Sequence, residues 1–113
     1  MYARTIKITF QDKFSKEMLV NYSNNVADSI GIKSGLLLKF IIEQSETVYI
    51  WVLVFADYDS YEADHKNNVV PLIESLKIQG LRVDLSDGPV VGDVAVSSNF
   101  MKLLKDRGTF YER

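Results

Sequence analysis

The stretch VYIWVLVFADYDSYEADHK, Val48–Lys66, decides the fold of this chain. Its first nine residues are apolar or aromatic without interruption. A strand with one face in water alternates apolar and polar residues, because successive side chains point to opposite faces. The strand at Val48–Ala56 therefore needs cover on both faces, and the polar residues after it restart a helical pattern.

The same reading of periodicity along the chain predicts an alternation of strands and helices. Ile6, Ile8 and Phe10 alternate with polar residues, as in a strand, whereas Pro71 fits the first turn of a helix and not its interior. The predicted strands are Tyr2–Phe10, Leu36–Glu43, Val48–Ala56 and Leu81–Leu85. Strand character resumes at Val90–Val96 after a turn or bulge at SDGP. The predicted helices are Ser15–Gly31, 60–66, 69–78, and a short last helix with Phe100, Leu103 and Leu104.

The predicted order, β-α-β-β-α-β, is that of the ferredoxin-like fold, an α+β architecture with both helices on one face of an antiparallel sheet. The short polar link QSET predicts a hairpin between the second and third strands. The length of 113 residues fits one domain, 1–113, with a short C-terminal helix and tail at about 98–113.

The third strand divides into two rows of side chains. One row is aliphatic (Val48, Ile50, Val52, Val54 and Ala56), and the other is larger and mostly aromatic (Tyr49, Trp51, Leu53 and Phe55). We expect the aliphatic row to face the helices and the aromatic row to lie on the uncovered face. An uncovered apolar face of this size favours a homodimer with the sheets packed face to face. The alternative is that the C-terminal helix folds back over that face.

Composition narrows the classes of partner. The net charge is −2 with Lys and Arg scattered, which argues against a nucleic-acid partner, and there is no cysteine for a disulfide or a thiolate site. The N-terminus has no signal-peptide pattern, and the apolar runs are too short to span a bilayer. We expect a cytoplasmic protein without a membrane partner. DGPVVG lacks a phosphate-loop pattern, and no cofactor is expected.

The chain resembles the dimeric α+β barrels, and among them the antibiotic-biosynthesis-monooxygenase-like group. The likeness rests on YARTIKITF, GLLLKFIIE and VLVFADYDSYEADH, the last of which runs from a strand into a helix. The resemblance implies a dimeric barrel with a ligand cavity beside the sheet. Some members of these families are cofactor-free oxygenases and some degrade haem.

Haem degradation is not expected for this chain. Haem-degrading members carry an Asn early in the first strand, where this sequence has Arg4, Thr5 and Lys7. They also carry a Trp at the start of the second helix and a His further along it. Here Tyr61 lies near that start, and the only histidine, His65, comes a turn or more too early.

Several residues are candidates for a ligand site. Tyr49, Trp51 and Phe55 are suited to line an apolar cavity, although a dry dimer core would use them equally well. Lys7 and Lys39 are assigned to the rows facing away from the helices, where a cation could meet a ligand carboxylate; the alternative is a lysine reaching to an open rim. The predicted ligand-binding residues are Lys7, Lys39, Tyr49, Trp51, Phe55, Tyr61 and His65.

His65 is the weak candidate for a catalytic acid or base, because its ordinary pKa lies near neutrality, but a solvated helix residue is the plainer interpretation. The acidic residues Asp57, Asp59, Glu62 and Asp64 are explained by the start of a helix. No metal site is predicted, since one histidine with scattered carboxylates is not a ligand set.

The leading functional hypothesis is binding of a small hydrophobic or aromatic molecule in an apolar cavity, with a fatty-acid-like carboxylate as one form of it. A cofactor-independent monooxygenase is the first alternative. A structural or regulatory dimer without a ligand is the second.

Overall fold

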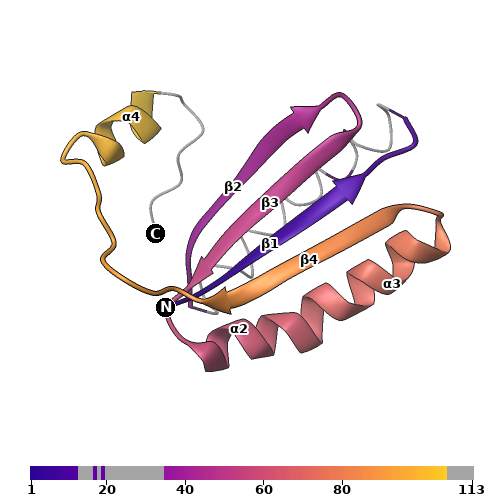
Figure 1. Cartoon of the computed structure of the whole chain (residues 1–113), viewed down its shortest axis with the longest axis horizontal. Helices are drawn as coiled ribbons and strands as arrows, with labels where there is room; N and C mark the ends of the chain where they lie inside the picture. The colour runs from indigo at the N-terminus through magenta and orange to yellow at the C-terminus, as the bar shows by residue number, and fades with distance from the viewer. Residues whose placement is uncertain (13–16, 18, 20–34, 107–113) are drawn as a thin grey trace.

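The structure is a computed structural model that describes residues 1–12, 17, 19 and 35–106. Its strands form one antiparallel sheet in the order β2-β3-β1-β4 (Figure 1). This order confirms the predicted ferredoxin-like α+β fold and the hairpin between the second and third strands. The strands are β1 (Tyr2–Thr9), β2 (Leu36–Ser45), β3 (Val48–Phe55) and β4 (Arg82–Pro89).

The described helices follow β3 and β4. α2 (Tyr58–Asp64), the π-helix η3 (His65–Val69) and α3 (Val70–Ile78) run on from one another along β4, and α4 (Phe100–Asp106) lies beyond β2 on the other side of the molecule (Figure 1). Of the predicted helix Ser15–Gly31, only Glu17 and Leu19 are described, both as helix; the rest of that prediction lies outside the described residues.

Local chemistry explains where these helices begin and change. The carboxylate of Asp57 accepts a hydrogen bond from the Ser60 N–H at 2.7 Å, and this bond lowers the pKa of Asp57. Asp59 lies inside the first turn of the helix. Pro71 lies at the start of α3 as predicted, and it has no N–H for the carbonyl of Asn67, so the helical pattern changes there.

The prediction for the last strand was wrong in its boundaries. β4 runs through SDGP to Pro89, and residues 90–96 form no strand. Gly88 and Pro89 pair with Ala3 and Tyr2 of β1. A proline is tolerated here because β4 is an edge strand and Pro89 is its last residue.

The cross-strand register assigns each residue to a face, because directly opposed residues lie on the same side of a sheet. Ile6 pairs with Trp51, and both lie in the core with Val69, Ile73 and Leu76, so this is the helix face. The opposite side, the open face, is not covered by α2, η3 or α3. It carries Leu38, Phe40, Ile42, Ile50, Val52 and Val54 on β2 and β3, and Ala3, Thr5, Lys7, Thr9, Arg82, Asp84 and Ser86 on β1 and β4.

The aromatic row of β3 therefore lies opposite to the prediction. Trp51 is 5 % exposed and Phe55 is 1 % exposed, and both are buried on the helix face. Phe10, Tyr49 and the helices of its own chain shield Trp51 from water. β3 has no polar residue to mark its outward side; the register with Ile6 and Ile8 of β1 fixes it.

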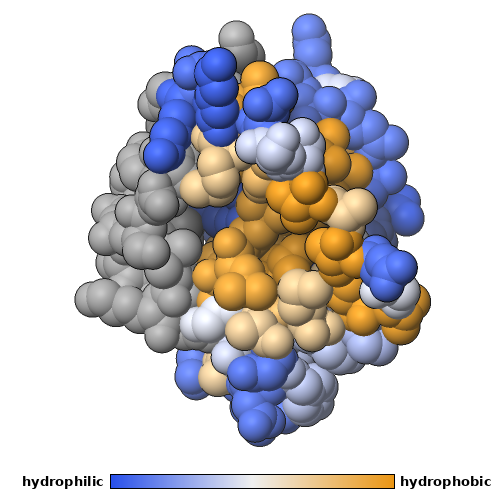
Figure 2. Space-filling view, turned by 90° about the vertical axis from the view of Figure 1, so that its left-hand side faces the viewer, coloured by the Kyte–Doolittle hydropathy of each residue, from blue (hydrophilic) through white to orange (hydrophobic). Residues whose placement is uncertain are grey.

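Apolar residues nevertheless remain uncovered on the open side. Phe40 and Ile42 are each 43 % exposed, and α4 has no buried residue. Figure 2 shows hydrophobic residues gathered over a hollowed part of the side on which β2 and α4 lie in Figure 1. The exposed large apolar residues of β2, α4 and the segment between β4 and α4 are Leu37, Phe40, Ile42, Val91, Val94, Val96, Met101 and Leu103.

Candidate functional site

The most unusual side chain of the helix face is Arg4, which is fully buried at 0 % exposure. It occupies the row of Ile6 and Ile8 on β1, opposite Leu53 of β3 and Asp87 of β4. A buried guanidinium is very costly unless charged and polar groups surround it. The environment of Arg4 therefore identifies the groups that the fold brings together for it.

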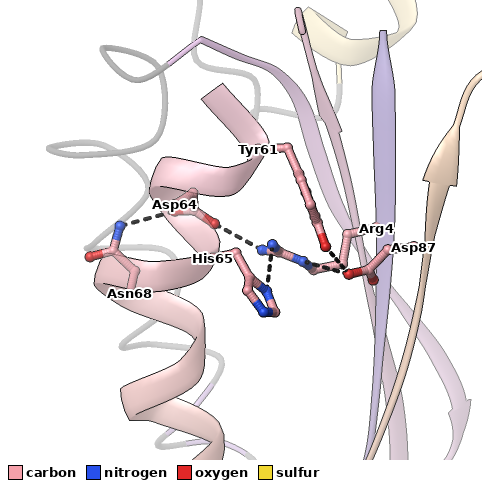
Figure 3. Close-up of polar contacts among 6 residues, drawn as sticks. All are labelled: Arg4, Tyr61, Asp64, His65, Asn68 and Asp87. Carbon is pink, nitrogen blue, oxygen red and sulfur yellow. Dashed lines mark hydrogen bonds and ion pairs between the residues drawn. The ribbon is translucent and has the colours of Figure 1, made fainter. Parts of the chain in front are cut away.

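Arg4 has a partner on each side of its guanidinium (Figure 3). Nη1 donates to Asp64 Oδ2 at 2.9 Å, and Nη2 lies 3.1 Å from His65 Nδ1. Nε lies 3.8 Å from Asp87 Oδ2, which makes an ion pair but not a hydrogen bond; no acceptor among the described residues hydrogen-bonds Nε. α2, η3 and β4 are thus joined to β1 through one side chain.

Aromatic rings and further hydrogen bonds complete the Arg4 network. The guanidinium carbon lies 4.6 Å from the centre of the Tyr61 ring and 5.6 Å from that of Phe55, within the range of cation–π attraction. The Tyr61 hydroxyl donates to Asp87, and Asn68 Nδ2 donates to Asp64 Oδ1 at 3.0 Å (Figure 3).

Electrostatics fix the state of Tyr61. Burial first, and then the hydrogen bond to Asp87, raises the pKa of Tyr61, so its hydroxyl remains a proton donor at neutral pH. The carboxylates of both Asp64 and Asp87 pair with the single guanidinium of Arg4. Arg4 is therefore already neutralised and is a poor partner for an anionic ligand.

The π-helix η3 lies where α2 meets this network. A π-helical turn is wider than an α-helical turn and occurs frequently at functional sites. His65 begins η3, and Asn68 lies within it. The irregular turn thus carries two side chains of the network at the point where the helix passes the end of β1.

The structure brings the predicted ligand residues to one face, with one exception. Lys39 pairs with Leu53, and Tyr49, Trp51 and Phe55 lie on the helix face with Tyr61 and His65. Lys7 lies on the open face opposite Ile50 and Asp84. The placement of Lys39 away from the helices was wrong, because Lys39 lies on the same face as its partner Leu53, a member of the aromatic row.

A register shift in β2 explains why its rows were hard to assign. Leu36 pairs with Phe55, but Leu38 pairs with Val54, so an irregularity at Leu37 changes the side to which alternate residues point. Leu36 consequently packs on the helix face, while Leu38, Phe40 and Ile42 lie on the open face.

Lys39 is the other titratable group of note on the helix face. Burial lowers its pKa from 10.5 to about 8. A lysine in this range is partly neutral in mildly alkaline solution and can then accept a proton.

Sequence reasoning missed Arg4, Asp87 and Asn68, and it explained Asp64 by the helix start alone. The sequence did contain a signal for Arg4. Arg4 lies in the same row of β1 as the apolar residues Ile6 and Ile8, so its side chain had to be buried and had to form an ion pair. Asp87 gave no such signal, since SDGP is typical of a turn.

Within the described residues, no group of three or more His, Cys, Asp or Glu residues is placed to hold a metal ion. None of the described helices is long and apolar enough to cross a membrane.

No protein-family model and no curated protein sequence matches this chain. Solved structures do match it. A protein from Deinococcus radiodurans assigned as a candidate antibiotic biosynthesis monooxygenase has a TM-score of 0.69 and 10 % identity, covering 87 % of this chain and 100 % of that one. A dimeric ferredoxin-like protein from an uncultured marine organism has a TM-score of 0.63 and 17 % identity, covering 82 % and 97 %.

SnoaB, a cofactor-independent oxygenase from Streptomyces nogalater, has a TM-score of 0.58 and 9 % identity, covering 82 % of this chain and 95 % of its own. At these identities the similarity shows the fold. The resemblance to the dimeric α+β barrels and to antibiotic-biosynthesis-monooxygenase-like proteins is thereby confirmed at the level of architecture.

Proposed function

We propose that this protein is a homodimer that binds a small hydrophobic or aromatic molecule on the helix face of its sheet. The observation that carries the ligand proposal is the division of the core. Among the described residues, the buried side chains form one cluster around Trp51 and another around Phe55 and Tyr61, and the partly buried Leu53 packs against both. Lys39 pairs with Leu53 across β2 and β3. A cationic side chain therefore lies beside the apolar residue that contacts both clusters.

The dimer proposal rests on the open face. Its half formed by β2 and β3 is apolar, and none of those side chains is buried. Its other half carries Lys7, Arg82 and Asp84. A two-fold axis would cover the apolar half of each copy, and similar solved structures include proteins described as dimeric.

A matched pair of lysine variants tests where an amphipathic carboxylate binds. Lys39→Met removes a cation on the helix face, and Lys7→Met removes one on the open face. We expect calorimetry to show weaker octanoate binding for Lys39→Met and unchanged binding for Lys7→Met, with indole binding unaffected by either. The reverse order would move the site to the open face.

Native mass spectrometry of the purified protein supplies the complementary measurement. We expect a dimer mass and a retained small molecule. If wild type retains nothing and binds neither octanoate nor indole, the ligand proposal fails and the structural or regulatory dimer remains.

The second candidate function is a cofactor-independent monooxygenase. The Arg4 network favours it, because it holds the ring of His65 in a fixed orientation, where the imidazole N–H can donate a hydrogen bond to a substrate on the face where the ligand is proposed. SnoaB, similar in fold, is described as such an oxygenase. Oxygen consumption with an electron-rich phenol in metal-free buffer tests this; loss of the activity in His65→Asn would support it, and no consumption by wild type would contradict it.

A further inference from the structure

The contact between Arg4 and His65 determines which nitrogen of the imidazole carries the proton. Arg4 Nη2 lies 3.1 Å from His65 Nδ1. A guanidinium has only donors, so Nδ1 must accept with its lone pair. The neutral ring then carries its single proton on Nε2, and Figure 3 shows the second ring nitrogen pointing away from Arg4.

The ring is held in this orientation from several sides. It stacks on Tyr61 with centres 5.7 Å apart and planes at 25°, and the Tyr61 hydroxyl is itself bonded to Asp87. Asp64, beside His65 in the chain, holds Nη1 of the same guanidinium. Within the described part of the chain nothing accepts a hydrogen bond from Nε2, and His65 is only half-buried.

We propose that His65 is a hydrogen-bond donor, through Nε2–H, to an uncharged acceptor oxygen of the bound molecule, and that Arg4 is the positioning residue that sets this tautomer. The inference rests on the proposed function and names the ligand class at one end of the site. It also reassigns His65, because the lone pair that would serve a general base is occupied by Arg4.

The charge around His65 selects among acceptor oxygens. Asp64 and Asp87 outweigh Arg4 by one charge, so a ligand carboxylate at Nε2 meets net repulsion. A ketone or quinone carbonyl does not. The ligand class at this end is therefore an aromatic or apolar molecule with a neutral carbonyl oxygen, while a carboxylate belongs near Lys39.

Nitrogen NMR of the imidazole tests the tautomer without any ligand. His65 is the only histidine, so its ring signals need no assignment by mutation. We expect the Nε2–H form in the neutral ring of wild type and of Arg4→Lys, in which the cation still donates. A dominant Nδ1–H form in wild type would overturn the inference.

Two substitutions of His65 separate its two nitrogens. His65→Asn keeps an acceptor near the Nδ1 position but has no donor at the Nε2 position, whereas His65→Gln reaches that position with an amide N–H. Acetophenone and ethylbenzene are matched probes with the same ring, with and without a carbonyl. NMR titration of each probe reports binding and, through the His65 signals, its location.

Wild type is expected to bind acetophenone about fivefold more tightly than ethylbenzene, the factor typical of one net hydrogen bond. His65→Asn should abolish this preference and leave ethylbenzene binding unchanged, and His65→Gln should retain part of it. Benzoate should perturb the His65 signals less than acetophenone does at equal concentration.

The outcomes distinguish this inference from the function on which it rests. If both probes bind and the carbonyl preference survives in His65→Asn, the donor role is wrong while ligand binding stands. If neither probe binds wild type, the proposed ligand site fails and the ligand class fails with it, whatever the tautomer.

Discussion

The two faces of the sheet are built from the same strands but are stabilised by different interactions. On the helix face, Trp51 and Phe55 are buried, and Arg4 is enclosed by charged and aromatic partners. On the open face, Val52 and its apolar neighbours on β2 and β3 are not buried, and polar residues follow on β1 and β4. The bulkiest side chains of β3 thus lie where helices of the same chain bury them. Smaller aliphatic side chains lie on the open face, which we propose packs against a second copy of the chain.

The largest expected effect is on the helix face. Trp51→Ala should lower the free energy of unfolding by about 3–5 kcal/mol, because it leaves a cavity among Phe10, Tyr49 and the helices. Chemical denaturation followed by circular dichroism measures this loss. The exposed Ile78 is the control, and Ile78→Ala should change stability by less than about 0.5 kcal/mol. Similar losses for both variants would mean that Trp51 is not in the core.

Removing the buried cation should be the next largest effect. Arg4→Met leaves Asp64 and Asp87 without their partner and should cost about 3 kcal/mol of unfolding free energy. Arg82→Met is the matched control, because the ion pair of Arg82 with Asp84 is exposed to solvent. Such exposed pairs contribute less than about 1 kcal/mol to the free energy of unfolding. Equal losses in the same denaturation experiment would show that the Arg4 network does not stabilise the fold.

A charge in the apolar half of the open face should act on assembly instead. Val52→Lys should raise the dissociation constant of the proposed dimer by about a hundredfold, since an unpaired cation would be buried on association. Ser86→Lys lies in the same row of the sheet on the polar side and should change it little. Sedimentation over a range of concentrations measures both. A wild-type monomer at micromolar concentration would remove the dimer from the proposal.

The smallest expected effect is the pH dependence of Lys39. Its pKa in the folded chain is about 8, below the 10.5 of an unperturbed lysine. The unfolded chain therefore binds more protons between these two pH values, and stability rises with pH across that window. Below about pH 8 the cost of burying the charge is fully present.

Lys39→Met should consequently stabilise the protein at pH 7, by about 1 kcal/mol after allowing for its partial exposure, and this gain should shrink toward pH 10. Denaturation at both pH values measures it, with the exposed Lys77→Met as the control. A gain that is the same at pH 7 and pH 10 would show that the lysine charge is not its source.

Local pattern was sufficient for most of the secondary structure. The alternation in Tyr2–Phe10, the QSET link and the position of Pro71 each reflect constraints that act within a few residues, and β1, the hairpin and the start of α3 follow them. The SDGP segment gave a wrong strand boundary, because its residues favour turns in isolation. In the folded chain, pairing of Gly88 and Pro89 with β1 extends the edge strand β4.

The sequence by itself determined the ferredoxin-like order and the need for cover on both faces of β3, because strand and helix periods and uninterrupted apolar runs are local properties. Only the tertiary structure decided which row of β3 faces the helices, because a strand that is apolar on both sides carries no mark of direction until it pairs with β1. It also decided the candidate site. Arg4, Asp87 and the helical turn that carries Tyr61 and His65 are distant in the chain. Their chemistry exists only where burial forces their charges and hydrogen bonds to be satisfied together.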